Sequence, residues 1–160
     1  MKGRLNMKRI KVREDWCLGC HLCEYYCAYT NAASGPLTPS DMAKRLRDGR
    51  IYSRVRIEDG DNNIHFAVSC RHCKDAICVR SCIAGALSVQ DDVVVIDKNK
   101  CVGCHTCVMV CPFGALSVSP EGTMQKCELC VKNSGGVPAC VAHCPNKAIV
   151  FEERGERPCM

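Results

Sequence analysis

Short apolar segments rich in β-branched residues recur along the chain, and polar or cysteine-rich stretches separate them. IKV (10–12) and VVVI (93–96) each precede a cysteine group, whereas AGALSV (84–89), GALSV (114–118) and NKAIVF (146–151) each follow one. Short β-branched runs bounded by turn residues are typical of strands. Their recurrence at equivalent positions predicts an internal repeat of strand, cysteine loop, short helix and strand.

Residues 28–69 depart from this repeat and form an insertion. Ser40, after Pro39, is expected to cap a short helix over DMAKRLRDGR that ends at Gly49. The segments IYSRVRIE and NIHFAV flank the turn residues 59–62, which predicts a β-hairpin. In the first of these segments the expected apolar positions are every second residue: Ile51, Ser53, Val55 and Ile57.

Cysteine dominates the chemistry of the chain. There are 17 cysteines in 160 residues, while aromatic residues make up only 5%. A fold so poor in aromatic side chains needs other material at its centre, and bound metal can supply it. Sixteen of the cysteines form four motifs: Cys17, Cys20, Cys23 and Cys27; Cys70, Cys73, Cys78 and Cys82; Cys101, Cys104, Cys107 and Cys111; and Cys127, Cys130, Cys140 and Cys144.

The spacing of these motifs indicates iron–sulfur chemistry. The first and third motifs read C-x2-C-x2-C-x3-C, and all four end in C-x3-C. In two-cluster ferredoxins the first three cysteines of such a run ligate one cluster and the fourth ligates the other. We expect the fourth cysteine to start the following helix, where Pro112 and Pro145 suit the first turn. The sequence therefore predicts four [4Fe–4S] clusters.

Other interpretations of the cysteines fit less well. Zinc ribbons use pairs of C-x2-C and need neither the third step nor the C-x3-C ending. Disulfides are disfavoured by the odd cysteine count and by C-x2-C loops that converge on a metal. Cys159 fits no motif and is expected to be a free thiol. Each motif is complete without histidine, so four neighbouring histidines are expected to shield or hydrogen-bond near the clusters: His21, His72, His105 and His143.

Charge and hydropathy narrow the class of protein. No apolar run approaches the roughly 18 residues that suggest a membrane span, and the basic N-terminus lacks the apolar stretch of a secretory signal. We therefore expect a cytoplasmic location, where thiols remain reduced or bind metal. The formal charge is +5. Sixteen thiolates and four oxidised cores would bring it to about −3, so a basic isoelectric point does not argue for nucleic acid.

With these motifs, the sequence resembles the four-cluster iron–sulfur subunits of the dimethyl sulfoxide reductase and formate dehydrogenase beta-subunit type. It is also similar to the small polyferredoxin subunits of carbon monoxide dehydrogenase and tungsten aldehyde oxidoreductase. The resemblance covers about residues 10–151 and implies an α+β fold of two fused bacterial-ferredoxin-like βαβ units wrapped around the clusters. It also implies nested ligand sets: Cys17, Cys20, Cys23 with Cys144; Cys127, Cys130, Cys140 with Cys27; Cys70, Cys73, Cys78 with Cys111; and Cys101, Cys104, Cys107 with Cys82.

The nested pairing predicts a division of the chain. Residues 1–27 and 112–151 would form one ferredoxin-like half, and residues 70–111 the other, with 28–69 inserted and 152–160 as a tail. Two positions depart from the family pattern, because Ala28 and Ile83 stand where proline would follow the fourth cysteine. Neither change removes a ligand, so only local helix geometry is expected to differ.

The resemblance implies a non-catalytic electron-transfer subunit, and the sequence has no phosphate loop, nucleotide fingerprint or catalytic triad. The expected catalytic partner is a carbon monoxide dehydrogenase or a tungsten aldehyde oxidoreductase, with a hydrogenase or formate dehydrogenase as alternatives. An NAD(P)H-linked flavoprotein or a ferredoxin would be the second partner. A freely diffusing polyferredoxin is an alternative function, and a cluster- or zinc-based regulatory protein that binds nucleic acid is a third.

The insertion is strongly basic, and two interpretations stay open. It could form a docking surface for an acidic partner, or a solvated face without a partner. The residues concerned are Lys44, Arg45, Arg47, Arg50, Arg54 and Arg56.

Overall fold

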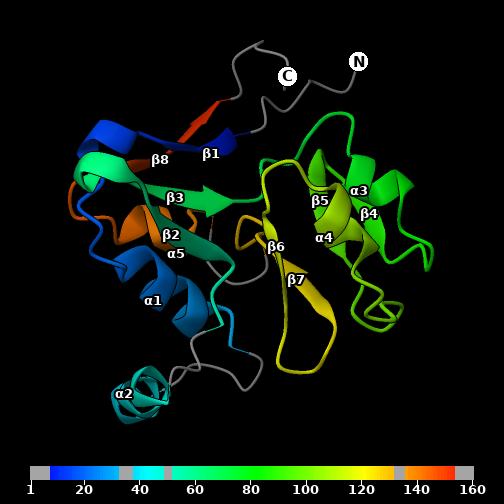
Figure 1. Cartoon of the computed structure of the whole chain (residues 1–160), viewed down its shortest axis with the longest axis horizontal. Helices are drawn as coiled ribbons and strands as arrows, with labels where there is room; N and C mark the ends of the chain where they lie inside the picture. The colour runs from blue at the N-terminus through cyan, green and yellow to red at the C-terminus, as the bar shows by residue number, and fades with distance from the viewer. Residues whose placement is uncertain (1–7, 33–37, 49–51, 132–135, 154–160) are drawn as a thin grey trace.

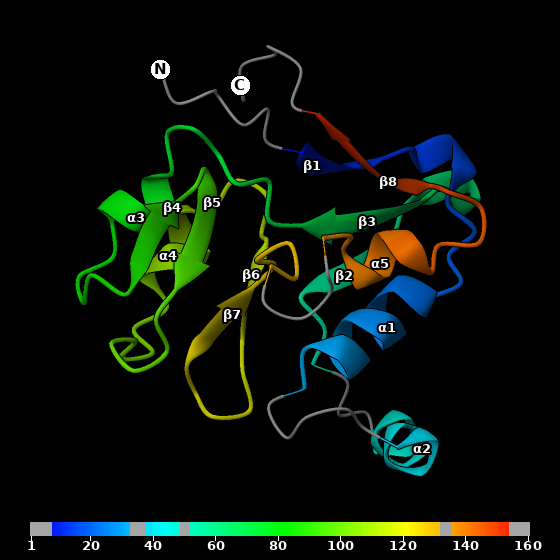
Figure 2. The same ribbon diagram turned by 180° about the vertical axis from the view of Figure 1, so that it is seen from behind.

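A computed structural model of the chain describes residues 8–32, 38–48, 52–131 and 136–153. The strands and short helices gather into two lobes that lie side by side (Figures 1 and 2). One lobe contains α1 (Leu22–Thr30), α5 (Ala139–Ala142) and the strands at both ends of the described chain. The other contains α3 (Ile77–Arg80) and α4 (Thr106–Val110). No helix in these described ranges is long and apolar enough to cross a bilayer.

Within the described residues, eight strands form four antiparallel pairs, and the pairing runs in a circle around the repeats. The strand that follows each cysteine motif pairs with the strand that precedes the next motif, and the strand after the last motif pairs with the strand before the first. The pairs are β2 (Val55–Asp59) with β3 (His65–Ser69), β4 (Leu87–Gln90) with β5 (Val93–Ile96), β6 (Leu116–Val118) with β7 (Met124–Lys126), and β8 (Ile149–Glu153) with β1 (Lys8–Val12).

The predicted repeat of strand, loop, helix and strand is therefore present, but the fourth cysteine does not start the helix as expected. The helices α3, α4 and α5 all end before the fourth cysteine of their motif. Cys111 follows α4 with extended backbone at φ −78° and ψ 112°. Pro112 explains this conformation, because proline disfavours helical backbone in the residue before it. The proline ends a helix here and does not begin one.

Motif one behaves differently from the other three. Motif two also lacks the proline, since Ile83 follows Cys82, yet α3 ends at Arg80, so the absence of proline permits a longer helix but does not by itself produce one. Ala28 permits the helix to continue, and α1 runs through Cys27 to Thr30. Cys27 thus lies inside a helix, whereas the fourth cysteines of the other motifs lie after one. The expected local difference in helix geometry is confirmed at this position.

The helix of the insertion is α2 (Pro39–Arg47), and its cap differs from the prediction. Thr38, and not Ser40, caps the helix: its hydroxyl accepts a hydrogen bond from the Asp41 N–H at 3.2 Å, while the Asp41 carboxylate accepts one from the Thr38 N–H. Pro39 is the first helical residue, where its missing N–H leaves no bond unmade. The predicted end at Gly49 lies outside the described residues. Figure 1 shows α2 at one edge of the molecule, next to α1.

The predicted hairpin of the insertion is confirmed, since β2 and β3 pair around a turn that contains a 3-10 turn (Asp61–Asn63). A second 3-10 turn, Glu14–Trp16, connects β1 to the first motif. The β2–β3 hairpin belongs to the core of the first lobe, where Val55 and Ala67 pack with the cysteines of α1 and α5. The core of the second lobe includes Leu116 and Met124 of the β6–β7 hairpin.

The predicted division of the chain at residues 27, 69 and 111 stays a prediction. The packing bears on its boundaries, because one hairpin from the predicted insertion joins the first core. The β6–β7 hairpin, which the prediction assigns to the first half, packs in the second core. The α+β ferredoxin-like fold class itself is confirmed.

We expect Met42→Ala to detach α2 from the rest of the molecule. Met42 is 1% exposed and packs beside Ala28, Tyr25 and Tyr29 of α1. Replacing a buried methionine with alanine costs about 2–5 kcal/mol, so the free energy of local opening of α2 should fall by about 2 kcal/mol or more. Hydrogen exchange of the α2 amides measures this opening.

The matched control is Met109→Ala, because Met109 is 86% exposed. It should leave amide exchange and iron content unchanged. Identical exchange of α2 in M42A and the wild type would contradict the role of Met42.

Candidate metal centres

The cysteine loops owe their shape to residues with left-handed backbone. In each motif the residue just before the second cysteine has a positive φ: Gly19, His72, Gly103 and Leu129. Glycine adopts this conformation without steric cost, whereas His72 and Leu129 adopt it against their preference. At Gly103 a Cβ atom would also lie 2.7 Å from the Gly122 carbonyl oxygen, so a side chain cannot be accommodated there. The same local turn directs the cysteines of every motif.

The first predicted set lines one small cavity. Cys17, Cys20 and Cys23 of motif one and Cys144 of motif four all border it, and Ile149 lies in its wall. Cys23 is buried, while Cys20 is exposed. The cavity therefore brings together all four cysteines that the nested pairing assigns to one cluster.

An equivalent cavity occurs in the second lobe. Its lining includes Cys101, Cys104 and Cys107 of motif three and Cys82 of motif two. Cys104 is exposed and lies 3.4 Å from the Thr106 hydroxyl. This arrangement repeats that of motif one, with the second cysteine at the surface and the third buried.

The remaining cysteines of the second lobe also interact. Burial raises the pKa of the Cys78 thiol, and the nearby Cys70 and Cys111 thiols raise it further. Cys73 belongs to the same loop as Cys70. Cysteines from motifs two and three thus approach one another as the nested pairing requires.

The fourth set is the most deeply buried. Burial raises the pKa of the Cys140 thiol far above its usual range, and Cys127, Cys27 and Cys130 all add to this effect. The Asn31 amide nitrogen lies 3.7 Å from the Cys27 sulfur and 3.5 Å from the Cys130 sulfur, so it links motifs one and four. Asn31 is a residue that the sequence analysis did not identify.

Backbone amides point at several of these sulfurs. After motifs two and three the chain turns through a left-handed glycine, and the following alanine N–H donates to the fourth cysteine. The Ala86 N–H lies 3.3 Å from the Cys82 sulfur, and the Ala115 N–H lies 3.5 Å from the Cys111 sulfur. Cys27 sits within α1, and its sulfur instead receives the Arg54 N–H at 3.3 Å and the Asn31 amide. Such hydrogen bonds to ligand sulfurs tune the reduction potential of an iron–sulfur cluster.

The Cys23 and Cys127 thiols are neutral at pH 7 when no metal is bound. Burial is the main cause that raises the pKa of Cys23 and of Cys127 to about 12. Metal ligation requires thiolates, so cluster assembly displaces protons from these groups.

The chemistry of the donor set fits a cluster better than a single ion. None of the 16 motif cysteines is in a disulfide. Across the described ranges, no three histidine, cysteine or carboxylate side chains gather tightly enough to hold one metal ion. A [4Fe–4S] cluster binds each thiolate through a different iron, so its ligands surround a larger body. Two cavities are each lined by four cysteines from two motifs, the number of ligands that such a cluster takes.

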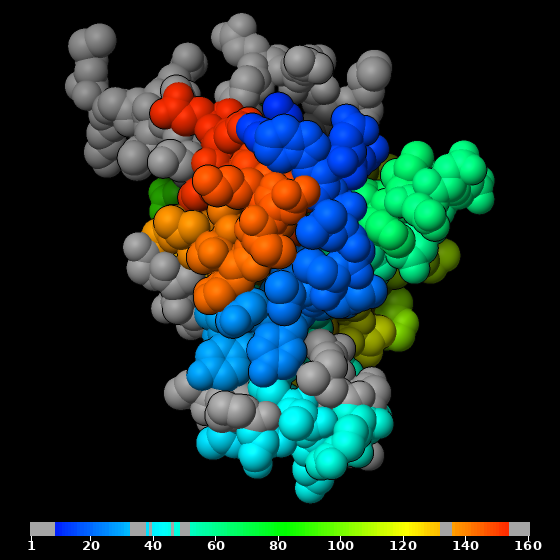
Figure 3. All heavy atoms as spheres, turned by 90° about the vertical axis from the view of Figure 1, so that its left-hand side faces the viewer, coloured from blue at the N-terminus to red at the C-terminus, as the bar shows by residue number. Residues whose placement is uncertain are grey.

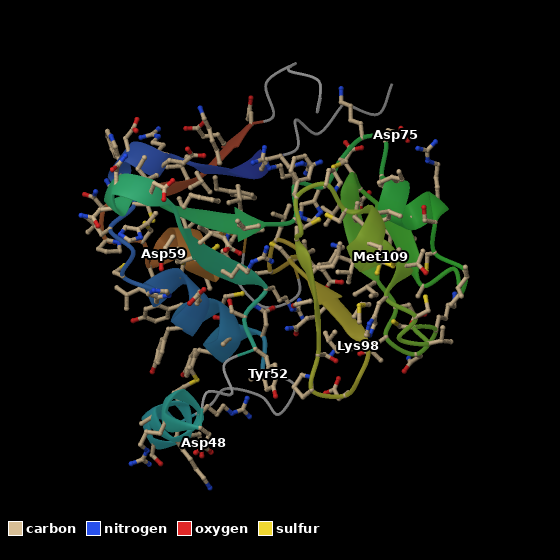
Figure 4. All side chains as sticks on the ribbon, in the orientation of Figure 1. Asp48, Tyr52, Asp59, Asp75, Lys98 and Met109 are labelled. Carbon is tan, nitrogen blue, oxygen red and sulfur yellow. The ribbon has the colours of Figure 1, made fainter. Side chains whose placement is uncertain are left out.

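The histidines near the motifs have separate structural roles. The Nδ1 atom of His21 contacts the Glu24 carboxylate at 2.7 Å, and His72 accepts a hydrogen bond from the Val94 N–H. The ring of His143 stacks on Tyr26 with centroids 3.6 Å apart. The lone cysteine, Cys159, lies outside the described residues. Figure 4 shows sulfur atoms within both lobes of the ribbon.

Two basic residues of the insertion are structural rather than free for docking. Arg54 forms an ion pair with Glu128 at 3.2 Å, and both side chains are largely buried. Arg56 donates to the Gly114 carbonyl oxygen and pairs with Glu58. Arg50 lies outside the described residues. The exposed basic side chains among the described residues of the insertion are Lys44 and Arg47 of α2, together with Arg56, which is exposed although it is paired.

Comparison with known proteins identifies a family. A family model described as "4Fe-4S dicluster domain" matches residues 62–154. An iron–sulfur protein of Rhodospirillum rubrum is 37% identical over 88% of this chain and 79% of its own length. The electron transport protein HydN of Escherichia coli (strain K12) is 31% identical over 88% of this chain and 85% of its own length.

Larger relatives and a solved structure share the same region. A sulfite dehydrogenase subunit of Allochromatium vinosum is 32% identical over 84% of this chain and 64% of its own length. UacF of Escherichia coli (strain K12) is 36% identical, but the chain spans only 20% of its length. A chain of the BamBC complex of benzoyl-coenzyme A reductase has a TM-score of 0.50 at 24% identity, over 92% of this chain and 80% of that chain. This last likeness concerns the fold.

We expect Asn31→Ala to lower the reduction potential of one cluster. The Asn31 amide donates to two sulfurs of the set formed by Cys27, Cys127, Cys130 and Cys140, and these bonds favour the more negative reduced state. A hydrogen bond is worth about 0.5–1.5 kcal/mol, which is roughly 20–60 mV for a one-electron step. A redox titration followed by electron paramagnetic resonance measures the shift.

The matched control is Asn99→Ala, since Asn99 is exposed. It should leave all potentials unchanged. Equal potentials in N31A and N99A, at full iron content, would show that Asn31 does not tune a cluster.

Proposed function

The chain belongs to the family of 4Fe-4S dicluster ferredoxin-like electron-transfer subunits, and on this basis we propose that it relays single electrons through four [4Fe–4S] clusters. The electrons would pass between the catalytic subunit of an oxidoreductase complex and a second redox partner. The observation that carries the proposal is the grouping of cysteines from different motifs, with two complete sets lining cavities.

Contacts between the sets support a single electron path. Cys23 and Cys27 lie on the same helix, which brings the sets of motifs one and four together. The Cys127 thiol interacts with Cys70, so motif four adjoins motif two. The helices α3 and α4 pack together and link motif two to motif three. The order of the clusters along the path is then motif one, motif four, motif two and motif three.

Exposure supports the two ends of this path as the places where partners bind. Cys20 and Cys104 are the exposed cysteines among the 16, and they belong to the two terminal sets. Exposed apolar side chains accompany both: Leu18 and Trp16 near Cys20, and Val102 and Ile83 near Cys104. Apolar surface around an exposed ligand suits a partner that must approach closely. Met109 and Asp59 mark the two lobes in Figure 4.

The side chains of the protein would hold and insulate the clusters, while the clusters supply the one-electron chemistry when bound. Apolar side chains enclose the cysteines in the core of each lobe. Val55 and Ile149 do so in the first lobe, and Leu87 and Val94 in the second. These apolar walls exclude water, and the amides that donate to sulfur stabilise negative charge. The chain would therefore set potentials and distances and would not bind a substrate.

The catalytic partner proposed from the sequence resemblance is a carbon monoxide dehydrogenase or a tungsten aldehyde oxidoreductase. A hydrogenase and a formate dehydrogenase are alternatives, and the sulfite dehydrogenase relative adds a further one. A flavoprotein linked to NAD(P)H, or a ferredoxin, would bind at the other end. The metal content of the complex isolated from its host distinguishes these partners. Nickel would indicate a carbon monoxide dehydrogenase or a hydrogenase, and tungsten or molybdenum would indicate an aldehyde or formate enzyme.

A freely diffusing polyferredoxin is the second candidate function. HydN supports it, because that relative is described as an electron transport protein. Purification without oxygen distinguishes the two candidate functions, because a free carrier elutes alone and a subunit elutes with its enzyme. A regulatory protein that binds nucleic acid has little support, because Arg54 and Arg56 of the basic insertion are engaged within the protein.

The anaerobically purified chain should contain about sixteen iron and sixteen sulfide per molecule. Cys73→Ala and Cys111→Ala should each lower both numbers to about twelve. Under the nested pairing these two variants lose the same cluster, so the same three reduction steps should remain in their redox titrations. Cys107→Ala should lose a different step.

The control is Cys159→Ser, which should retain about sixteen iron. Zinc with little iron and no sulfide would overturn the cluster assignment. If C111A instead matched C107A in its remaining steps, each motif would hold its own cluster and the nested pairing would be wrong.

A further inference from the structure

Lys126 is a buried lysine at the end of β7, one residue before motif four. It is 1% exposed and is among the largest fully buried side chains of the described chain. Its ammonium donates to the Cys127 carbonyl oxygen at 2.7 Å and to the carbonyl oxygen of Val94 in β5. Lysine is almost never fully buried unless its charge is compensated. The position therefore requires a source of negative charge.

Carboxylates on the neighbouring elements do not supply this charge. Across the described ranges, the ion pairs do not include Lys126. Glu128 lies two residues further on, and Lys126 and Glu128 both line one cavity between the hairpins. The Glu128 carboxylate is occupied by the Arg54 guanidinium at 3.2 Å and by the Ile96 N–H at 2.9 Å. A buried charge without a counter-charge is strongly destabilising.

The ligand sets provide the missing charge on two sides. The Lys126 ammonium bonds directly to the Cys127 carbonyl oxygen of motif four, and Cys78 of motif two packs against the core cluster that contains its other acceptor, Val94. These cysteines belong to different sets, one from motif two and one from motif four. An oxidised [4Fe–4S] core of about +2 with four thiolates carries about −2, so each set would offset the buried ammonium.

We propose that Lys126 is the internal counter-cation shared by the two central clusters, and that its charge raises the reduction potential of both. This inference rests on the proposed cluster set. Each reduction adds one negative charge beside the fixed positive charge, so reduction of either central cluster is favoured. The two end clusters belong to sets whose thiols do not include Cys78 or Cys127, and their potentials should not depend on Lys126.

The test compares Lys126→Met with Lys126→Arg in the full chain. Methionine keeps most of the length of the side chain without its charge, whereas arginine keeps the charge. In K126M, two of the four reduction steps should shift to lower potential, with at least a tenfold fall in the equilibrium constant for reduction, or about 59 mV per one-electron step. K126R should keep the wild-type steps. Lys98→Met serves as the control, because Lys98 is a partly exposed lysine in the same lobe.

Iron and sulfide are measured in every variant, so failure of cluster assembly is distinguished from a change in potential. Should K126M hold too little iron to titrate, Lys126→Gln replaces it, because the amide can still donate to both carbonyl oxygens. Loss of clusters in both neutral variants, with full loading of K126R, also supports the proposal, since charge is then what the site requires. Unchanged potentials in a loaded neutral variant overturn it. Lowered potentials in K126R equal to those of the neutral variants would overturn it as well.

Discussion

Cysteine sulfur occupies the centre of both lobes, where most proteins of this size place large apolar side chains. Cys23, Cys27 and Cys140 are among the buried residues of the first core, and Cys107 of the second. The strands and helices around them are short, so little other apolar surface is available to hold the lobes together. The fold therefore depends on how sixteen thiols are satisfied, and the proposed cluster ligation would supply both the filling and the cross-links.

Local backbone geometry meets this requirement in the same way four times. A left-handed residue before the second cysteine turns each loop, a short helix follows, and the fourth cysteine reaches towards a different motif. Figure 3 shows α1 packed directly beside the segment that carries α5 and β8, which brings motifs one and four together. Motif one achieves the result with a longer helix, and Asn31 adds a side-chain donor to the Arg54 backbone N–H at the Cys27 sulfur.

Much of this organisation is evident from the sequence, because cysteine spacing and β-branched runs are local signals. The strands before motifs one and three, the strands after motifs two, three and four, and the hairpin after residue 54 are where the pattern indicates, whereas no β-branched run marks β7. The helix ends are harder to predict, because a proline can either be the first residue of a helix or end the helix that precedes it. Side chains with non-local roles could not be predicted. Nothing in the sequence indicates that Arg54 pairs with Glu128, or that Lys126 is buried, because both follow from the contact between distant hairpins.

The pairing of β8 with β1 closes the ring of repeats, and it also determines how the module can be used. Lys8 lies opposite Glu153 in this pair, so the first and last described residues are neighbours at one edge of the molecule. A module that begins and ends at the same place can be inserted into a surface loop of another protein, or joined to further domains, without disturbing either core. In the proposed electron-transfer role, such a unit would keep the order of its clusters wherever it is inserted, and the surfaces at its two exposed cysteines would be the parts that adapt it to a different enzyme.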